Sequence, residues 1–357
     1  MLNKLVSFSN YYGKNPELVL AGGGNTSAKS DGIMYVKGSG TSLATITAEQ
    51  FVKIDLSKLN EIFEKTYPDS DDEREALVLA DLMASRAEGE ESKRPSVETT
   101  LHALFEQTFV LHLHPALVNG LTCSKGGETL ATELFGDSFI WVDACRPGYI
   151  LAKLCCDKMQ EYKERKDVCA DIIILQNHGI FIADDTVEGL DEKLSKVMKT
   201  LENHLVKKPD TSAVESVAAP ELDFAEAVVH IANADCERFS SCAESASVLL
   251  KPFTPDHIVY CKAFPLFVKK GEDVKAKYDG YIESYVVSPR IVIIEGKGIF
   301  AIGTDAKQAA TAKLLFEDAV KIAVYTESFG GALHMSDELT DFIVNWEVES
   351  YRSSQNK

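Results

Sequence analysis

The chain lacks the features that would place it in a membrane or among disulfide-rich proteins. It contains no run of about 18 apolar residues, the length that a membrane-spanning helix needs. Its start lacks the apolar core and small-residue cleavage site of a signal peptide. Its eight cysteines form no CxxC pair or framework spacing, which indicates reduced thiols. We therefore expect a cytoplasmic protein with no membrane partner.

Basic residues are also scarce. Lys and Arg number 37 against 55 Asp and Glu, which gives a net charge of −18 and argues against a nucleic-acid partner. The deficit of basic residues is uneven along the chain. Residues 1–56 hold 5 basic and 4 acidic residues, whereas residues 57–93 hold 5 basic and 11 acidic residues. An anionic small-molecule substrate is thus compatible with the nearly neutral first segment.

Two nucleotide-binding signatures are missing, the P-loop GxxxxGK[ST] and the dinucleotide fingerprint GxGxxG. The chain instead has two loops of small residues, at 22–27 and 38–41. Glycines expose backbone N–H groups, and Asn, Thr and Ser add neutral donors that suit phosphate oxygens. Each loop taken alone is equally consistent with an ordinary turn.

A length of 357 residues predicts two domains. Residues 207–222 are small, polar and contain proline, so they predict a linker between a domain at 1–206 and a second at 223–357. In the first domain the sequence predicts strands at 33–37, 51–56, 109–114 and 172–175, and helices at 73–86, 95–107, 149–165 and 184–206. In the second it predicts a helix at 223–245, a strand at 256–268, a charged hairpin, a strand at 290–295 and a helix at 305–327.

A faint internal repeat links the two halves. Residues 172–181 align without gaps to 291–300 with five identities in ten, and residues 33–37 echo 258–262. The repeat predicts a shortened, degenerate second copy in which Lys297 stands at the position of His178. The residues between the repeated elements, including the strand with two histidines, are expected to be missing from that copy.

The strongest local signal is His112-Leu113-His114. Side chains alternate along a strand, so both imidazoles project from one face and can share a tetrahedral ion. Two unrelated histidines are the alternative. His178 follows a buried strand and precedes a glycine, which fits either a third ligand or a capped turn. Glu98 lies 14 residues before His112 and is either a ligand or general base, or an ordinary helix glutamate.

The sequence resembles the class II aldolase/adducin domains. The motifs that carry this resemblance occur in the family's order over residues 21–183: GGGNTSAK, a DG turn, YVKGSGT, TAEQFVKIDL, PSVETTLH, VLHLHP and LQNHGIF. The acidic segment before PSVET is most similar to the aldolase regions of bifunctional rhamnulose-phosphate aldolase/dehydrogenases. The resemblance implies an α/β, three-layer fold with a central, mostly antiparallel sheet flanked by helices. We expect the smaller degenerate copy beside it to have no metal site.

The resemblance also implies roles for individual residues. His112, His114 and His178 become the ligands of one Zn²⁺, or of another divalent cation, and Glu98 becomes the acid/base that the metal can also bind. The substrate phosphate is expected at a set of small polar residues: Asn25, Thr26, Ser27, Ser39, Gly40 and Ser96. Many aldolases have a serine at Val97, so one phosphate donor is missing. The family's tyrosine acid has Tyr149 as its nearest candidate.

The implied activity is that of a zinc-dependent aldehyde-lyase. It would cleave a ketose 1-phosphate, such as rhamnulose or fuculose 1-phosphate, into dihydroxyacetone phosphate and an aldehyde through a metal-stabilised enediolate. A sugar-phosphate epimerase or decarboxylase of the same family would use the same residues, and an adducin-like scaffold would need none of them. Family members usually form tetramers, so a homo-oligomer is expected. The sequence specifies neither the sugar and its stereochemistry nor the number of subunits.

Overall fold

The computed structural model describes residues 1–346, which divide into two compact units. The first contains Met1–Val118 and Glu128–Asn203. The second contains residues 204–346 together with Asn119–Gly127, a segment that the sequence does not assign to it. Gly120 explains this assignment, because a Cβ atom there would lie 2.3 Å from the Cβ of Tyr325. Only a residue without a side chain allows such a close approach.

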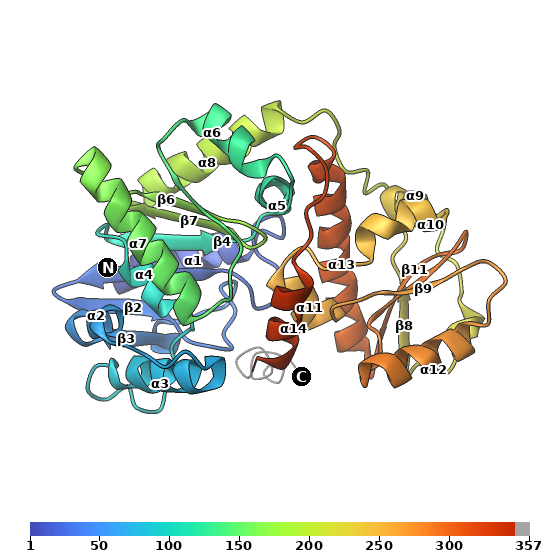
Figure 1. The fold of residues 1–357 in the computed structure, drawn as a ribbon, viewed down its shortest axis with the longest axis horizontal. Coiled ribbons are helices and arrows are strands. Elements are labelled where there is room, and N and C mark those ends of the chain that lie inside the picture. The colour runs from blue at the N-terminus through green and yellow to red at the C-terminus, as the bar shows by residue number, and fades with distance from the viewer. Residues whose placement is uncertain (347–357) are drawn as a thin grey trace. The chain divides into compact units, whose positions relative to one another are not determined.

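A seven-stranded sheet forms the centre of the first unit (Figure 1). Its order is β3-β2-β1-β4-β7-β6-β5. All neighbouring strands are antiparallel except β5 and β6, which confirms the predicted α/β class with a mostly antiparallel sheet. The strands are β1 (Asn25–Ser30), β2 (Ile33–Lys37), β3 (Phe51–Asp55), β4 (Phe109–Leu113), β5 (Ile140–Val142), β6 (Ile172–Leu175) and β7 (Gly179–Asp184).

Helices cover both faces of this sheet, as adjacent residues of β1 show. Thr26 Oγ1 lies 2.8 Å from Ser9 Oγ on α1 (Leu2–Gly13), whereas Ser27 Oγ lies 2.8 Å from His102 Nδ1 on α4 (Thr99–Ala103). Because neighbouring side chains of a strand point to opposite faces, α1 and α4 lie on opposite sides of β1. The α4 side also carries α7 (Tyr149–Lys166), and an apolar core fills the space beneath these two helices.

The helices of the first unit differ from the prediction in two places. The acidic segment contains two helices, α2 (Leu56–Glu64) and α3 (Asp71–Ala84), rather than one. The helix predicted over 95–107 shrinks to α4, because Pro95 pairs with Gly38 in extended conformation and Ser96 N–H donates to the Lys37 carbonyl. The helices α7 and α8 (Val187–Asn203) match the prediction closely. Two more helices, α5 (Ala116–Thr122) and α6 (Gly127–Phe135), were not predicted.

The second unit contains a four-stranded sheet in the order β8-β11-β10-β9. Its strands are β8 (Ala227–His230), β9 (Leu266–Val268), β10 (Ile291–Ile294) and β11 (Gly298–Gly303). Its helices are α9 (Ala234–Ser240), α10 (Ala243–Ala246), α11 (Pro255–Cys261), α12 (Val274–Tyr285), α13 (Ala306–Thr326) and α14 (Asp337–Asn345).

Several predictions for this half were wrong. The expected helix 223–245 contains strand β8 before α9, and the expected hairpin contains α12, whose N-cap Asp273 accepts the Ala276 N–H at 2.8 Å. The expected strand 256–268 begins as α11, whose residues Asp256–Cys261 are all buried, and only its end forms strand β9. A short buried helix shows no apolar–polar periodicity, so it resembles a buried strand in sequence. The echo between 33–37 and 258–262 was therefore accidental.

The other repeat is real in three dimensions. The strand series β8-β11-β10-β9 has the same order and the same parallel or antiparallel pairings as β4-β7-β6-β5. The β10–β11 and β6–β7 turns share a residue with positive φ at the same position, Gly296 and Asn177. The expectation that the second copy lacks the histidine strand was wrong. Strand β8 is its counterpart, and His230 pairs with Phe300 as His112 pairs with Phe181.

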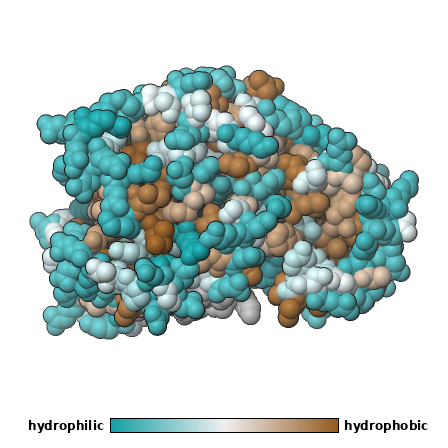
Figure 2. Space-filling view, viewed as in Figure 1, coloured by the Kyte–Doolittle hydropathy of each residue, from teal (hydrophilic) through white to brown (hydrophobic). Residues whose placement is uncertain are grey.

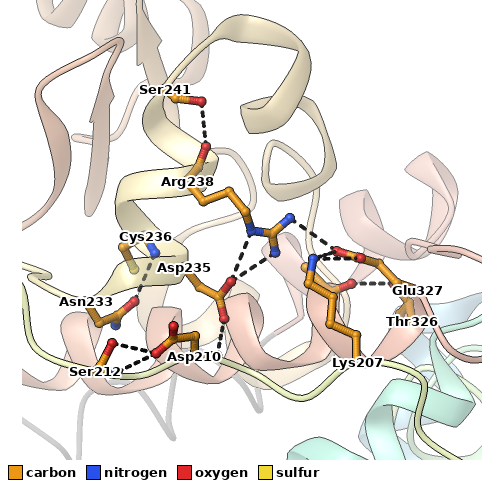
Figure 3. A network of polar contacts seen from close by, with 11 residues as sticks. Lys207, Asp210, Ser212, Asn233, Asp235, Cys236, Arg238, Ser241, Thr326 and Glu327 are labelled. Carbon is orange, nitrogen blue, oxygen red and sulfur yellow. Dashed lines mark hydrogen bonds and ion pairs between the residues drawn. The ribbon is translucent and has the colours of Figure 1, made fainter.

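The first part of the predicted linker 207–222 is bonded to the second unit (Figure 3). Asp210 N–H donates to the buried Asp235 carboxylate at 2.6 Å, and Arg238 Nη2 lies 3.0 Å from the same carboxylate. Arg238 and Lys207 both reach Glu327, at 3.3 and 2.9 Å. This network fixes the chain where it enters the second unit.

Hydrophilic side chains cover most of the face seen in Figure 2. Among residues 1–346, no helix combines the length and apolar character needed to cross a bilayer. The most exposed large apolar side chains are Val286 and Val206, at 86% and 82%.

Val286 should be an unfavourable residue at its position. It caps the C-terminus of α12 with φ +60°, a left-handed conformation that costs a β-carbon-bearing residue about 1–2 kcal/mol. Because its side chain is exposed, Val286→Gly should lose little packing and raise the free energy of unfolding by about 1 kcal/mol. Val344→Gly within α14 should instead lower it. Urea denaturation midpoints compare the two, and a lower midpoint for Val286→Gly would contradict this reading.

Candidate metal centre

Three histidines and one glutamate from different parts of the first unit meet at one place. His112 and His114 extend from the same face of β4, His178 lies in the turn between β6 and β7, and Glu98 caps the N-terminus of α4. One ligand atom from each of the four lies within 4.8 Å of all the others. The strand alternation predicted for His112 and His114 is confirmed, and the structure brings His178 and Glu98 to the same point.

The spacing of these atoms fits a single cation. His112 Nε2 lies 2.8 Å from His114 Nε2 and 3.2 Å from Glu98 Oε1, and His178 Nε2 lies 3.6 Å from Glu98 Oε1. Ligand atoms around one tetrahedral ion, each bonded at about 2.0–2.2 Å, lie about 3.4 Å apart. Three imidazoles and a carboxylate are also an ordinary donor set for a divalent metal. These four residues can therefore hold such an ion.

The His112 ring is held with its Nε2 lone pair toward the cluster. Its Nδ1 lies 3.0 Å from the Ile180 carbonyl, which can only accept, so Nδ1 carries the proton and donates. Phe181 stacks on the ring at 3.9 Å between centroids and 16° between planes. Burial lowers the pKa of His112 to about 4, although the nearby Glu98 carboxylate opposes this shift. The ring is thus neutral at pH 7 and ready to act as a ligand.

Glu98 is oriented by a fully buried amide. Burial raises the pKa of its carboxyl, but the His112 and His178 rings outweigh that effect and hold the pKa well below its usual value. Asn25 Nδ2 donates to Oε2 at 3.0 Å, which leaves Oε1 facing the imidazoles. The neighbouring strand positions explain the contact, because Asn25 on β1 pairs directly with His112 on β4.

A family model described as the class II aldolase and adducin N-terminal domain matches residues 4–203, more than half of the chain. The chain belongs to this family. The four clustered residues all lie inside the matched segment.

Other comparisons give more distant likenesses. YuxG of Bacillus subtilis, an uncharacterized oxidoreductase, is 22% identical over 410 residues, covering 98% of this chain and 58% of that protein. The chain thus spans less than two thirds of the length of this curated relative. An N-terminal class II aldolase domain from Thermoplasma acidophilum is 26% identical, with 57% and 92% of the two chains covered and a TM-score of 0.47. The L-fuculose-1-phosphate aldolase of Thermus thermophilus is 14% identical, with 57% and 94% covered and a TM-score of 0.35.

The residues that the class II aldolase resemblance assigns to phosphate fall into two groups. Ser39 and Ser96 are half-buried and Gly40 is exposed, and the Gly38–Pro95 bridge brings their two segments together. Lys37 Nζ donates to the Gly22 carbonyl at 2.9 Å, which ties the other glycine loop to this place. Asn25, Thr26 and Ser27 form the second group, and all three are fully buried.

Within the second group the polar side chains are bonded inside the protein. Asn25 reaches Glu98, Thr26 reaches Ser9, and Ser27 reaches His102. The structure therefore brings Asn25 to the metal cluster, as a partner of Glu98. Phosphate binding by the members of either group stays a prediction.

Phe181 contacts the cluster in a way that the sequence did not indicate. Phe181 supports the His112 ring, a contact that follows from the β4–β7 register and is invisible without it. The His102 ring, on α4, meets Phe181 edge-on at 5.3 Å between ring centroids. Tyr149, the nearest candidate for the family's tyrosine acid, packs against Tyr67 at 4.8 Å between ring centroids.

The second unit carries an altered version of the centre. His230 takes the position of His112 and stacks on Phe300, Ala232 takes that of His114, and Lys297 takes that of His178. His230 Nδ1 accepts the Val217 N–H at 3.1 Å, so in the neutral ring the proton sits on Nε2. That nitrogen then has no lone pair for a cation. Lys297 forms an ion pair with Glu221 instead.

Gly179 should be essential for the centre. A Cβ atom there would lie 2.4 Å from the Leu113 carbonyl oxygen and 2.7 Å from His114 Cδ2, so Gly179→Ala must displace the end of β4. We expect zinc affinity, measured by competition with a chromophoric chelator, to fall at least about tenfold. Gly280→Ala is the control, because a Cβ there meets nothing within 4 Å. Equal zinc affinity in Gly179→Ala and the wild type would contradict this account.

Proposed function

We propose that the protein is a zinc-dependent aldehyde-lyase that cleaves a ketose 1-phosphate into dihydroxyacetone phosphate and an aldehyde. The observation that carries this proposal is the convergence of the Glu98 carboxyl group with the rings of His112, His114 and His178. Family membership supports it, because the matched domain includes all four residues. The sugar, of rhamnulose or fuculose type, is proposed from the motif resemblance.

The donor set supports zinc as the metal. Imidazole nitrogens and a carboxylate are typical ligands of catalytic zinc sites. The chemistry that a divalent cation supplies when bound there is Lewis-acid stabilisation of negative charge on substrate oxygens.

Glu98 is the residue proposed to move protons. During cleavage the C3–C4 bond breaks, and its electron pair passes toward the C2 carbonyl to give an enediolate. The C4 hydroxyl loses its proton and becomes the aldehyde, and C3 then takes up a proton to give dihydroxyacetone phosphate. A carboxylate oriented by Asn25 and facing the cluster can carry out such transfers with little reorganisation.

One residue of the proposed phosphate site, Ser96, lies two residues before Glu98 in the chain. Ser96 Oγ accepts the Glu98 N–H at 3.3 Å, so the segment that presents Ser96 also positions Glu98. The hydroxyls of Ser39 and Ser96 and the exposed backbone at Gly40 provide donors, and the buried Lys37 adds positive charge behind them. Anchoring the phosphate there would hold the ketose in a fixed orientation relative to Glu98.

An adducin-like scaffold is the rival from a different functional class. Three histidines and a glutamate with converging ligand atoms favour the enzyme, because buried polar groups cost stability that a scaffold has no reason to give up. An epimerase or decarboxylase would use the same residues, so product analysis across a panel of ketose 1-phosphates separates these enzymes.

Glu98→Gln should abolish triose phosphate release while zinc remains bound. The amide keeps the size of the side chain but cannot take up a proton, so we expect at least a hundredfold loss of turnover. The three imidazoles retain the metal, which metal analysis of the same sample checks. Glu106→Gln is the control, because that exposed glutamate pairs only with surface groups such as Lys163. Normal cleavage by Glu98→Gln would refute the assigned role.

A further inference from the structure

A strand and a helix of the first unit make two matched contacts beside the metal cluster. Asn25 and Ser27 are two residues apart on β1 and extend from the same face. Glu98 is the N-cap of α4, and His102 lies four residues later, in the last turn of this short helix. Asn25 Nδ2 bonds to Glu98 Oε2 at 3.0 Å, and Ser27 Oγ bonds to His102 Nδ1 at 2.8 Å.

The geometry of the two elements explains this match. Two residues of a strand span about 6.7 Å, and four residues of a helix rise about 6 Å. Side chains at i and i+2 of the strand can therefore meet those at i and i+4 of the helix. The His102 backbone N–H also donates to the Glu98 carbonyl at 3.1 Å, so these two residues stand at the two ends of a single helical turn. Contacts that hold the His102 side chain therefore also fix the position of Glu98 at the N-terminus of α4.

His102 is connected to the other side of the cluster as well. Its ring meets Phe181 edge-on, at 5.3 Å and 75°, and Phe181 stacks on the His112 ring. Both Glu98 and His112 therefore depend on contacts that His102 makes.

Packing alone does not account for a histidine at this place. The side chain is fully buried, and its Nε2 has no hydrogen-bond partner within the part of the chain that the structure describes. An apolar ring would fill the same space without leaving a buried polar atom unpaired. The hydrogen bond that the His102 ring does make is the one from Nδ1 to Ser27 Oγ.

We propose that His102, held by Ser27, is a positioning residue of the metal centre, which sets the place of Glu98 and the orientation of the His112 ring. The inference rests on the proposed function in that it takes these residues as the working centre. It assigns His102 no contact with substrate or with reacting atoms.

The experiment uses the full chain loaded with Co²⁺, whose visible absorption reports the geometry of its ligands. His102→Phe keeps a ring but removes the bond to Ser27, and Ser27→Ala removes the other partner. We expect each to change the cobalt spectrum and to weaken cobalt binding by about 10- to 100-fold. The double variant should lose no more than the worse single variant, because both remove one contact. His102→Asn, which can bond to Ser27 again, should recover much of the loss.

Ser9→Ala is the matched control, because it removes a buried hydroxyl contact of the same length, 2.8 Å to Thr26, on the opposite face of β1. It should leave the cobalt spectrum unchanged. Wild-type spectra in His102→Phe and Ser27→Ala, or an equal effect of Ser9→Ala, would overturn the proposal. A protein that binds cobalt with the expected variant pattern but cleaves no sugar phosphate would refute only the proposed function. A wild-type protein that takes up no cobalt would refute both.

Discussion

The hydrogen bond from His112 Nδ1 to the Ile180 carbonyl is the contact on which the centre depends. It fixes the proton on one nitrogen of a fully buried ring and so directs the lone pair of the other toward His114, His178 and Glu98. The bond exists because β4 lies between β1 and β7. One neighbour supplies Asn25 to orient Glu98, and the other supplies Phe181 to support the ring. The geometry of the candidate metal site is thus a product of the strand order.

The second unit has the same strand arrangement, but its histidine makes a different hydrogen bond. His230 keeps the stacking contact with Phe300, but its Nδ1 accepts a backbone N–H rather than donating to a carbonyl. The neutral ring then presents a proton where His112 presents a lone pair. Lys297 stands in place of a third imidazole and pairs with Glu221. The two copies therefore differ in the hydrogen-bond partner of the shared histidine and in the residues at the positions of His114 and His178.

Much of the centre could be predicted from the sequence, because strand alternation, residue type and the glycine after His178 each constrain the chemistry locally. Four strands of the first sheet (β2, β3, β4 and β6) were predicted, whereas β1, β5 and β7 were missed, and residues 25–27, expected in a loop, begin β1. Asn25 as the partner of Glu98 could not be predicted, since the contact depends on how α4 packs on β1. The counterpart strand β8 was missed because His230 stands alone, with Ala232 where the second histidine would be. The buried helix α11 was taken for a strand because it lacks an exposed polar face.

The central claim is that one divalent metal binds at Glu98, His112, His114 and His178. X-ray absorption at the zinc edge, recorded on the reconstituted full chain with its metal content, tests this most directly. The account predicts one zinc per chain, with three imidazole nitrogens and oxygen completing its ligands. Failure to retain zinc after reconstitution, or a spectrum dominated by sulfur ligands, would contradict it.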